Sequence, residues 1–426
     1  MSRYDLVIFG ATGFTGQYVV QEVAQTCEHY SWAVAGRNRA KLESTMAAAG
    51  DRVGKDLSKI PIIIADVADE ESLRQMAIQA KIVINVVGPY RFYGEPVVKA
   101  CVEQGACHVD ISGEPIYLEG MQLKYDDKAK ESKVYVVGSC GFDSIPCDIG
   151  LQYAKKQLPG DMCGAETVVE FKSGPAGSKI NFGTFHSMIY GIANRHELKP
   201  LRKQLALPKL PTPQFRLPKR GSMFFMEKLG AYCLPFLGSD KSVAYRSQVY
   251  NYENRNERPI HLNTYFKSGS MLESVLMVMW GIMFFMMANI SFGRKLLEKY
   301  PELFTFGKFS KAGPTEEQIE QASFSYWIFA KGWKNKMSDT SVQHSTPPDT
   351  EMVARVDGPD PGYVGTSACL VACAKTILED RANLPQGGGV FTPGALFHGT
   401  NLIERLSERN VKFTVVNPPS DIQDKE

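Results

Sequence analysis

FGATGFTG, residues 9–16, closes a short apolar run at Tyr4–Phe9 and opens a helical pattern at Thr15–Cys27. The spacing G-x-x-G-x-x-G between a strand and a helix is typical of a loop that binds a dinucleotide. Gly10 permits a tight turn, Gly13 lets the backbone approach a pyrophosphate, and Gly16 lets the helix pack closely. The free N–H groups at the start of a helix also attract an anion. The alternative to a cofactor loop is a purely structural turn. We predict that the cofactor is held by Gly10, Ala11, Thr12, Gly13, Phe14, Thr15 and Gly16.

The residues after the second strand candidate, Ser31–Ala35, indicate which dinucleotide binds. Many NAD sites carry an acidic side chain roughly 20 residues beyond the glycines, where it binds the ribose hydroxyls. This chain has Arg37 at that place, followed by Lys41. A guanidinium group can clasp a 2′-phosphate through two hydrogen bonds, whereas a carboxylate would repel it. We therefore predict NADP(H), with Arg37 and Lys41 near the phosphate; the alternative is that both cations begin a solvated helix.

Two further strand ends belong to the predicted cofactor site. Asp66 follows the third strand candidate, Pro61–Ala65, and its carboxylate either meets the adenine amino group or caps the next helix. The fourth candidate, Lys81–Val87, is expected to lie beside the first strand in the sheet. This arrangement places Val87, Gly88 and Pro89 along the nicotinamide half of the cofactor.

Residues 1–150 alternate strand patterns with helical patterns throughout. This alternation predicts βαβ units and a Rossmann-type parallel sheet that forms a dinucleotide-binding domain. Its last two strand candidates are Ala106–Ile111 and Lys133–Gly138. Its other helical patterns are Glu70–Gln79, Pro96–Glu103 and Pro115–Glu131.

From residue 151 to residue 360 the strand patterns follow one another mostly without helices. They are Thr167–Lys172, Ser242–Tyr252, Ile260–Lys267, Ser323–Lys331 and Glu351–Val356. We predict an inserted, mostly antiparallel α+β domain over these residues. The α/β rhythm resumes in residues 361–426, with helices at Gly365–Glu379 and Leu402–Arg409 and a strand at Val411–Val416. This part is predicted to return to the first domain, so the fold class is α/β with an insertion.

The composition excludes several classes of protein. The chain has 426 residues, of which 44% are hydrophobic and 22% charged, so a core of ordinary size is available. The formal net charge of +2 offers no strong field for nucleic acid. The nine cysteines form no CxxC pair and no HExxH occurs, so we predict no metal site and free thiols. The absence of a G-x-S-x-G elbow and of a P-loop argues against α/β-hydrolases and P-loop NTPases.

Reduction of an activated C=C or C=N bond requires a positioned nicotinamide, a polar group for the acceptor and a proton donor. The carboxyl edge of a parallel sheet usually holds the ligand, which directs attention to Tyr90, Arg91 and Glu114. Tyr90 or Tyr93 could donate the proton and Arg91 could bind an acidic head group, whereas Glu114 could instead begin a helix. His186, from the inserted domain, is a further catalytic candidate, but a lone histidine is more often structural. Other polar residues at this edge are Tyr93, Asp110, Ser112, Asp143, Ser144 and Asp148; Asp143 and Ser144 could simply cap a helix.

Two segments of the inserted domain suggest contact with a lipid surface. Ser274–Gly293 carries no charge, and its 20 residues only just reach the length of a spanning helix. The interpretations are a buried core helix, a bilayer-spanning helix, and a shallow monotopic insertion of residues 271–293. A single span would separate the glycine-rich loop from the C-terminal return, so we favour the shallow insertion. Arg195–Arg220 holds eight Lys/Arg and five prolines, which excludes a long helix and favours either an anionic lipid surface or a solvated loop.

The chain carries, in order, GATGFTG (10–16), AGRNRAKL (35–42), NVVGPYRFYGEPVVKAC (85–101), HVDISGE (108–114) and GFDSIPCD (141–148). Together these motifs resemble the saccharopine dehydrogenase-like oxidoreductases of animals. The resemblance continues through KYPELFTFGKFSKAGPTEEQI (299–319) and GGGVFTPGALF (387–397), so it covers nearly the whole chain. It implies a Rossmann domain similar to that of saccharopine reductase, an inserted domain and a C-terminal return. It also implies association with lipid droplets and other membranes, mitochondria included, and bacterial relatives that are trans-acting enoyl reductases of glycolipid biosynthesis.

The sequence and the resemblance together predict an NADP(H)-dependent oxidoreductase at a lipid-droplet or membrane surface facing the cytosol, or at a mitochondrion. The substrate is expected to be a lipid-like or apolar small molecule, reduced at a C=C or C=N bond in lipid metabolism. One alternative is a non-catalytic NADP(H)-binding scaffold or redox sensor on droplets, because no proton-donor motif is recognisable. Another is a saccharopine-type imine reductase that acts on an amino acid. We expect no nucleic-acid partner, and a homodimer is a further expectation.

Overall fold

A parallel sheet built mainly from the N-terminal part of the chain carries the glycine-rich loop. The computed structural model describes residues 3–416, and its first sheet has the strand order β15-β6-β5-β4-β1-β2-β3. The strands are β1 (Tyr4–Phe9), β2 (Trp32–Gly36), β3 (Ile62–Ile64), β4 (Ala80–Asn85), β5 (Cys107–Asp110), β6 (Tyr135–Val137) and β15 (Gly389–Phe391). All pairings in this sheet are parallel, so the predicted Rossmann-type sheet is confirmed.

Helices cover both faces of this sheet, as its short apolar strands require. They are α1 (Phe14–Thr26), α2 (Arg39–Val53), α3 (Glu70–Ile78), α4 (Tyr90–Gln104), α5 (Pro115–Glu131) and α14 (Val364–Glu379). Along β1, Leu6 and Ile8 belong to one core cluster together with residues of α1 and α14. Val7 and Phe9 belong to a second cluster together with residues of α3 and α4. Successive side chains of a strand point to opposite faces, so an unbroken apolar run fills both cores.

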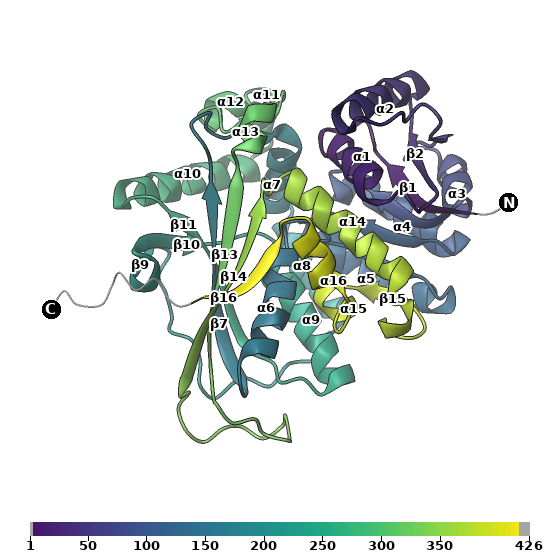
Figure 1. Ribbon diagram of the computed structural model, residues 1–426. Coiled ribbons are helices and arrows are strands. Elements are labelled where there is room, and N and C mark those ends of the chain that lie inside the picture. The colour runs from purple at the N-terminus through teal and green to yellow at the C-terminus, as the bar shows by residue number, and fades with distance from the viewer. Residues whose placement is uncertain (1–2, 417–426) are drawn as a thin grey trace.

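A second, larger sheet stands beside the first (Figure 1) and has the strand order β16-β14-β13-β7-β11-β10-β9. Its strands are β7 (Met162–Lys172), β9 (Phe224–Met226), β10 (Ala231–Pro235), β11 (His261–Ser268), β13 (Ser323–Gly332), β14 (Thr350–Pro359) and β16 (Lys412–Val416). The β11–β7 pair is parallel and the other pairs are antiparallel. The prediction of a mostly antiparallel inserted sheet is therefore confirmed.

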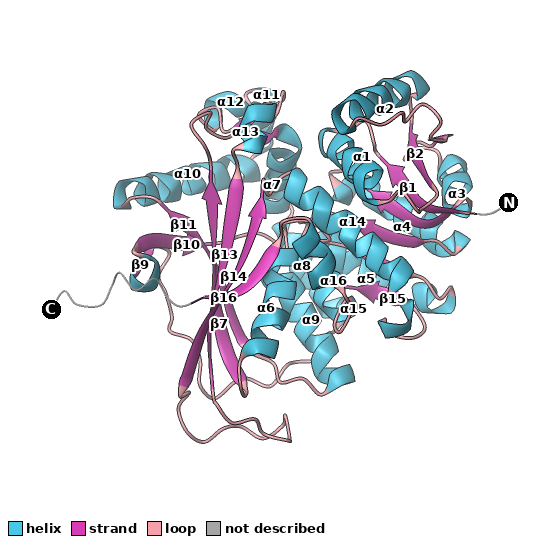
Figure 2. Ribbon diagram, viewed as in Figure 1, coloured by secondary structure: helices cyan, strands magenta, loops and turns pink. Residues whose placement is uncertain are grey.

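Helices α6 (Ile145–Gln157) and α9 (Asp240–Arg255) lie on the side of the second sheet that faces the first (Figure 2). One core cluster runs from Ile8 of β1 through Ile149 of α6 to Ile328 of β13. The two sheets therefore share a continuous hydrophobic core.

The predicted strand at Ser242–Tyr252 is wrong, because these residues form the middle of α9. Its buried positions recur with the three- and four-residue spacing of a helix face. Several of these buried positions are polar, so the apolar residues alone do not show the spacing of a helix. The buried positions within the predicted strand are Val243, Ala244, Arg246, Ser247, Gln248, Val249 and Asn251, of which Arg246, Ser247, Gln248 and Asn251 are polar.

Shorter elements complete the described part of the chain. A two-stranded parallel sheet joins β8 (Ile180–Asn181) to β12 (Phe309–Ser310). The remaining helices are α7 (Phe182–Ala193), α8 (Leu198–Leu205), α10 (Met271–Asn289), α11 (Ser291–Lys299), α12 (Pro301–Phe304), α13 (Glu316–Glu320), α15 (Pro393–Leu396) and α16 (Leu402–Glu408). Three 3-10 helices occur at Arg195–Glu197, Glu227–Leu229 and Arg381–Asn383. The basic segment Arg195–Arg220 thus contains the short α8 and no long helix, as expected.

The C-terminal part returns to both sheets. Helix α14 packs on α1, and β15 extends the first sheet beside β6, as the fold prediction requires. The last strand, β16, instead pairs with β14 at the edge of the second sheet. Residues 417–426 of the predicted return lie outside the described residues. The domain divisions at residues 150 and 360 stay predictions.

Within residues 3–416, α10 is the one helix long and apolar enough to cross a membrane. On its inner face, Phe284 and Ala288 are buried in a cluster with Phe185 and Ile189 of α7. Only 17% of its most apolar window is buried, so the interpretation of this segment as a core helix is wrong. The helix lies across one end of the second sheet (Figure 1), in contact with β10, β11, α7 and α11.

Candidate functional site

The glycine-rich turn between β1 and α1 has a shape that side chains would destroy. Gly10 has a φ angle of +93°, and a Cβ atom there would lie 2.7 Å from Cγ2 of Val87. A Cβ atom at Gly16 would lie 2.2 Å from the carbonyl oxygen of Gly10. The Gly13 N–H donates to the same oxygen at 2.9 Å, and Gly13 is the N-cap of α1 without a side-chain cap. The N–H groups of the first helical turn are therefore left for an anion, so this cradle fits a pyrophosphate.

Phe14 and the turn after β4 define the two sides of this cradle. The Phe14 ring packs on Tyr363 with 4.7 Å between ring centroids, and Phe14 is the first residue of α1. Residues Val87, Gly88 and Pro89 connect β4 to α4, and the Gly88–Pro89 peptide bond is cis. Since β4 pairs with β1, this turn stands next to the glycine-rich turn, where the nicotinamide half was predicted.

The ends of β2 and β3 bring Arg37 and Asp66 together. The Arg37 Nε atom lies 4.0 Å from Oδ2 of Asp66, and the arginine side chain is 74% exposed. Such an exposed guanidinium is free to bind a phosphate. Asp69, and not Asp66, caps α3 by accepting the N–H groups of the first turn, which removes the capping alternative for Asp66. Lys41 lies exposed in the first turn of α2.

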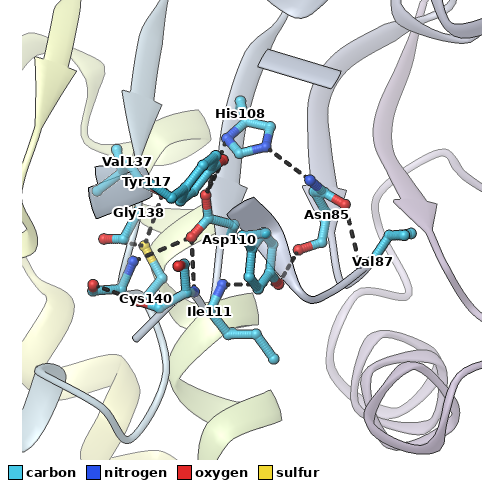
Figure 3. A network of polar contacts seen from close by, with 12 residues as sticks. Asn85, Val87, His108, Asp110, Ile111, Tyr117, Val137, Gly138 and Cys140 are labelled. Atoms are coloured by element: carbon cyan, nitrogen blue, oxygen red, sulfur yellow. Dashed lines mark hydrogen bonds and ion pairs between the residues drawn. The ribbon is translucent and has the colours of Figure 1, made fainter. Parts of the chain in front are cut away.

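A buried polar network lies under the turn after β4 (Figure 3). The Asn85 side chain contacts His108 Nε2 at 3.3 Å, and the Tyr117 hydroxyl donates to Asp110 Oδ2 at 2.9 Å. Asp110 also accepts the Ser112 N–H, yet burial raises the pKa of Asp110 to about 7. Burial likewise lowers the pKa of His108 to about 3, so this imidazole is neutral. The network fixes the ends of β4 and β5.

Tyr90, a predicted proton donor, lies inside this network. Its hydroxyl donates to the Asn85 carbonyl oxygen at 2.9 Å and accepts the Ile111 N–H at 3.4 Å. The residue is 7% exposed, and burial raises the pKa of its phenol well above the usual range. The phenol therefore holds the strand ends together, and its catalytic role stays a prediction.

Glu114 joins the first sheet to α7 of the inserted part. Its carboxylate accepts the N–H groups of Tyr90 at 2.9 Å and Arg91 at 3.2 Å, at the start of α4. It also accepts the hydroxyl of Ser187 at 3.0 Å. The Arg91 guanidinium forms an ion pair with Glu197 at 3.1 Å. The structure therefore brings Arg91 and Glu114 into one place, each with a protein partner.

Aromatic side chains of α4 and α7 face one another beside Glu114. His186 Nε2 lies 3.3 Å from Glu298 Oε1, and the imidazole stacks on Phe182. Phe92 approaches His186 and packs edge-on against Tyr190, with 5.1 Å between the ring centroids of Phe92 and Tyr190. Phe92 and Tyr93 remain 45% and 40% exposed, which gives the site an apolar, aromatic wall. Sequence analysis missed Ser187 and Tyr190, because no motif marks them.

The remaining acids near β6 hold helices together. Asp148 accepts the Ser247 hydroxyl at 2.6 Å and the Gly394 N–H at 2.7 Å, and burial raises its pKa to about 6. Asp240 accepts the Tyr326 hydroxyl at 2.6 Å, and burial raises its pKa to about 7. Ser144 is the N-cap of α6 but makes no side-chain cap. Through these hydrogen bonds Asp148 and Asp240 stabilise the packing of α6 and α9 against their neighbours.

Residues 6–137 match a family model described as the saccharopine dehydrogenase NADP binding domain. The match covers the glycine-rich turn, the ends of β2, β3 and β4, and the polar network below them. It supports NADP(H) as the cofactor, in agreement with the sequence prediction.

Three relatives extend the similarity over nearly the whole chain. A human protein named saccharopine dehydrogenase-like oxidoreductase is 42% identical over 422 residues, 97% of each chain. A Caenorhabditis elegans protein named lipid droplet localized protein is 41% identical over 419 residues, 97% of this chain and 98% of that one. An Arabidopsis thaliana protein named "probable mitochondrial saccharopine dehydrogenase-like oxidoreductase" is 34% identical over 445 residues, 97% of this chain and 96% of that one.

Among solved structures, the L-Glu-forming saccharopine dehydrogenase of Saccharomyces cerevisiae is similar in fold. The TM-score is 0.52 at 13% sequence identity, and the match covers 97% of this chain and 99% of that chain. The likeness agrees with a Rossmann-like sheet joined to a mixed second sheet.

Proposed function

We propose that this chain is an NADP(H)-dependent reductase that acts on an apolar substrate at a lipid surface. The premise is that the chain belongs to the saccharopine dehydrogenase-like oxidoreductase family. The observation that carries the proposal is the turn of residues 10–16, where a Cβ atom on Gly10 or Gly16 would clash with neighbouring atoms and the helix N-terminus has no side-chain cap. A cradle of this kind at a helix N-terminus is a binding site for a dinucleotide.

The residues around the turn divide the cofactor between them. The backbone of residues 10–16 would hold the pyrophosphate, Arg37 and Lys41 the 2′-phosphate, and Asp66 the adenine. The turn of residues 87–89 would face the nicotinamide. When bound, NADPH supplies a hydride; the protein has to orient the acceptor, exclude water and deliver a proton.

The wall of Phe92, Tyr93, His186 and Tyr190 supports an apolar substrate for this site. Aromatic and aliphatic walls with few polar groups are usual where a protein binds an apolar small molecule. The acceptor bond of such a substrate would be an activated C=C or C=N, because neither requires a metal or a covalent intermediate. Glu114 and Arg91 would orient the polar end of the substrate through the start of α4.

The outer face of α10 supports the lipid surface. Its exposed apolar side chains, together with those that follow it, are Met271, Leu272, Val275, Leu276, Met277, Met279, Ile282, Phe285, Met286, Ile290 and Phe292. The Arg195 guanidinium lies 4.3 Å from the Phe285 ring centroid and donates to Asn289 Oδ1, which places a cation at the rim. A large apolar face with cations at its edge is suited to a phospholipid layer. The inner face of α10 is packed on α7, so we favour a shallow insertion over a span.

The basic segment Arg195–Arg220 contributes less charge to that surface than its composition suggests. Arg202 donates two hydrogen bonds to Glu119, and Arg220 donates two to Glu166. Its other cations, among them Lys199 and Lys203, remain exposed. The location on a lipid droplet or another membrane, mitochondria included, and its cytosolic side rest on the relatives and on this surface.

The test is a fluorescence titration of the purified protein with NADPH and with NADH, followed by NADPH oxidation with trans-2-dodecenal in detergent micelles. We expect tight binding of NADPH, weaker binding of NADH, and oxidation that depends on the aldehyde. No binding of either nucleotide would contradict the proposal.

A scaffold or redox sensor is the second candidate, because Tyr90, Glu114 and His186 all have protein partners and none stands free to donate a proton. Such a protein would bind NADPH but oxidise it with no acceptor. A saccharopine-type imine reductase would need an α-amino acid and a keto acid, and it would be indifferent to removal of α10.

A further inference from the structure

Asp143 differs from the other acids around the ends of β5 and β6. Asp110, Glu114, Asp148 and Asp240 each accept two or more hydrogen bonds from named donors. Among the residues that the structure describes, Asp143 has no hydrogen-bond or ion-pair partner, although its side chain is partly buried. The Asp143 carboxylate is thus held in a partly buried position with no protein donor, which leaves it available to a ligand or a reaction.

The position of Asp143 is determined by the loop after β5. Its Oδ2 atom would lie 2.7 Å from a Cβ atom placed on Gly113, so only a glycine at position 113 lets the carboxylate lie there. Gly113 is followed by Glu114, which accepts the N–H groups that begin α4. Asp143 therefore stands at the carboxyl edge of the parallel sheet, beside β5 and β6, where the nicotinamide half of a dinucleotide and its acceptor are expected.

The surroundings of Asp143 favour its neutral form. Burial raises the pKa of this carboxyl group above its ordinary value. Burial raises the pKa of Asp240 on α9 as well, and the charge of Asp143 adds to that rise. Ser144, the next residue, has a φ angle of +114°, so the backbone is held in an unusual conformation at this point. The alternative that Asp143 caps α6 finds no support, because Ser144 is the N-cap.

We infer that Asp143 is the proton donor of the proposed reductase, and the inference rests on the proposed function. In the reaction, the acceptor's C=C or C=N π bond breaks, and one of its atoms takes the hydride. The O–H bond of Asp143 breaks as its proton bonds to the other atom. The acceptor is reduced, NADPH is oxidised to NADP⁺, and water re-protonates the carboxylate. In this scheme Tyr90, Glu114 and His186 donate no proton and only hold neighbouring groups in position.

The first test measures where Asp143 lies relative to the cofactor, without turnover. Carbon-13 NMR of aspartate-labelled protein, assigned with Asp143→Asn, gives the pKa of Asp143 in the NADPH and the NADP⁺ complexes. The positive charge of the oxidised nicotinamide should lower this pKa by about 1 pH unit relative to the NADPH complex. Equal values in the two complexes would overturn the inference. The signal of Asp127, whose side chain is 94% exposed on α5, should not move.

The second test is the variant itself, with Asp127→Asn as the matched control. Asp143→Asn should bind NADPH within about twofold of wild type and reduce trans-2-dodecenal about 100-fold more slowly. A variant that keeps its rate would overturn the inference. Failure of the proposed function would show differently: the wild type would bind NADPH and reduce nothing, while the two pKa values would still decide whether Asp143 faces the cofactor. Absence of NADPH binding would overturn both.

Discussion

The glycine-rich turn at residues 10–16 and the outer face of α10 carry the two halves of the proposed function, and they are built in opposite ways. In the turn, a Cβ atom at residue 16 would stand 2.2 Å from the Gly10 carbonyl oxygen, so the backbone fills its own space. On α10, Leu272 and Met279 are 69% and 61% exposed, so large side chains stand in solvent.

This difference separates two kinds of recognition. A phosphate cradle depends on the direction of a few N–H groups, and one added methyl group should destroy it. A lipid-binding face depends on summed apolar area, which has no direction and is spread over many side chains. Substitutions should therefore act abruptly in the turn and gradually on α10.

The largest effect is expected from Gly16→Ala, which forces a methyl group against the Gly10 carbonyl. Overpacking of this kind costs about 1–3 kcal/mol, and we expect NADPH affinity to fall about 100-fold in a fluorescence titration. The control is Gly120→Ala on α5, where no atom lies within 4 Å of the added methyl group. Wild-type affinity in Gly16→Ala would mean that the turn is not the cradle.

A smaller effect, confined to one nucleotide, is expected from Arg37→Ala. Loss of a charged hydrogen-bond donor costs about 1.5–3 kcal/mol, so NADPH should bind about 10- to 100-fold more weakly while NADH is unchanged. Arg39→Ala is the control, because that side chain is also exposed and also forms one loose ion pair, with Glu43 at 3.9 Å, but it is not proposed to bind the phosphate. Equal losses for NADPH and NADH would refute the assignment of Arg37 to the 2′-phosphate.

Three charges on α10 should act together where a single charge would not. In Leu272→Glu/Met279→Glu/Ile282→Glu, three side chains that are 69%, 61% and 55% exposed become ionic. We expect the fold to be unchanged and the fraction bound in flotation with phospholipid vesicles to be about tenfold smaller. The reason is that each of these side chains contributes at most about 1.5–3 kcal/mol of burial energy to membrane binding, and the three charges remove that contribution. Ile78→Glu on α3, where Ile78 is 46% exposed, should float like wild type. Unchanged flotation of the triple variant would exclude this face.

The smallest effect tests whether the two regions are linked through α7. Ser187→Ala removes the hydroxyl that donates to Glu114 at 3.0 Å. We expect urea unfolding to show a loss of about 1 kcal/mol, with NADPH affinity unchanged. Thr184→Ala, at an exposed position of α7, should change stability by less than about 0.5 kcal/mol. A large loss of NADPH affinity in Ser187→Ala would contradict the separation of the two regions.

The fold could be predicted best where burial is complete. The strands of residues 1–150 are covered on both faces, so they read as short apolar runs between helical patterns. Helix α9 was mistaken for a strand because polar residues occupy its buried face: the Ser247 hydroxyl donates to Asp148, and Gln248 Oε1 accepts the Ile260 N–H. Those contacts satisfy the buried polar groups, and no local pattern announces them.

The candidate site shows the same division. The turn of residues 10–16 and Arg37 could be proposed as cofactor contacts from the sequence because both lie within one βαβ unit. The contacts of Glu114 with Ser187 and of Arg91 with Glu197 join residues 73 and 106 positions apart, and neither partner carries a motif. Those pairings depend on how α7 and the 3-10 helix at Arg195–Glu197 pack against α4 and the start of α5.

Local sequence was therefore sufficient to predict an NADP(H)-binding domain, to propose the turn of residues 10–16 as its phosphate cradle, and to detect an uncharged segment of helix length. Each of these depends on residues close together in the chain and on backbone conformations that only certain residue types allow. Only the tertiary structure decided that α10 leaves its outer face exposed, that β16 joins the second sheet, and that Asp143 has no hydrogen-bond or ion-pair partner within residues 3–416 while its neighbours are paired. These features are set by contacts between distant segments, and a group's exposure or pairing exists only once the shared core has brought those segments together.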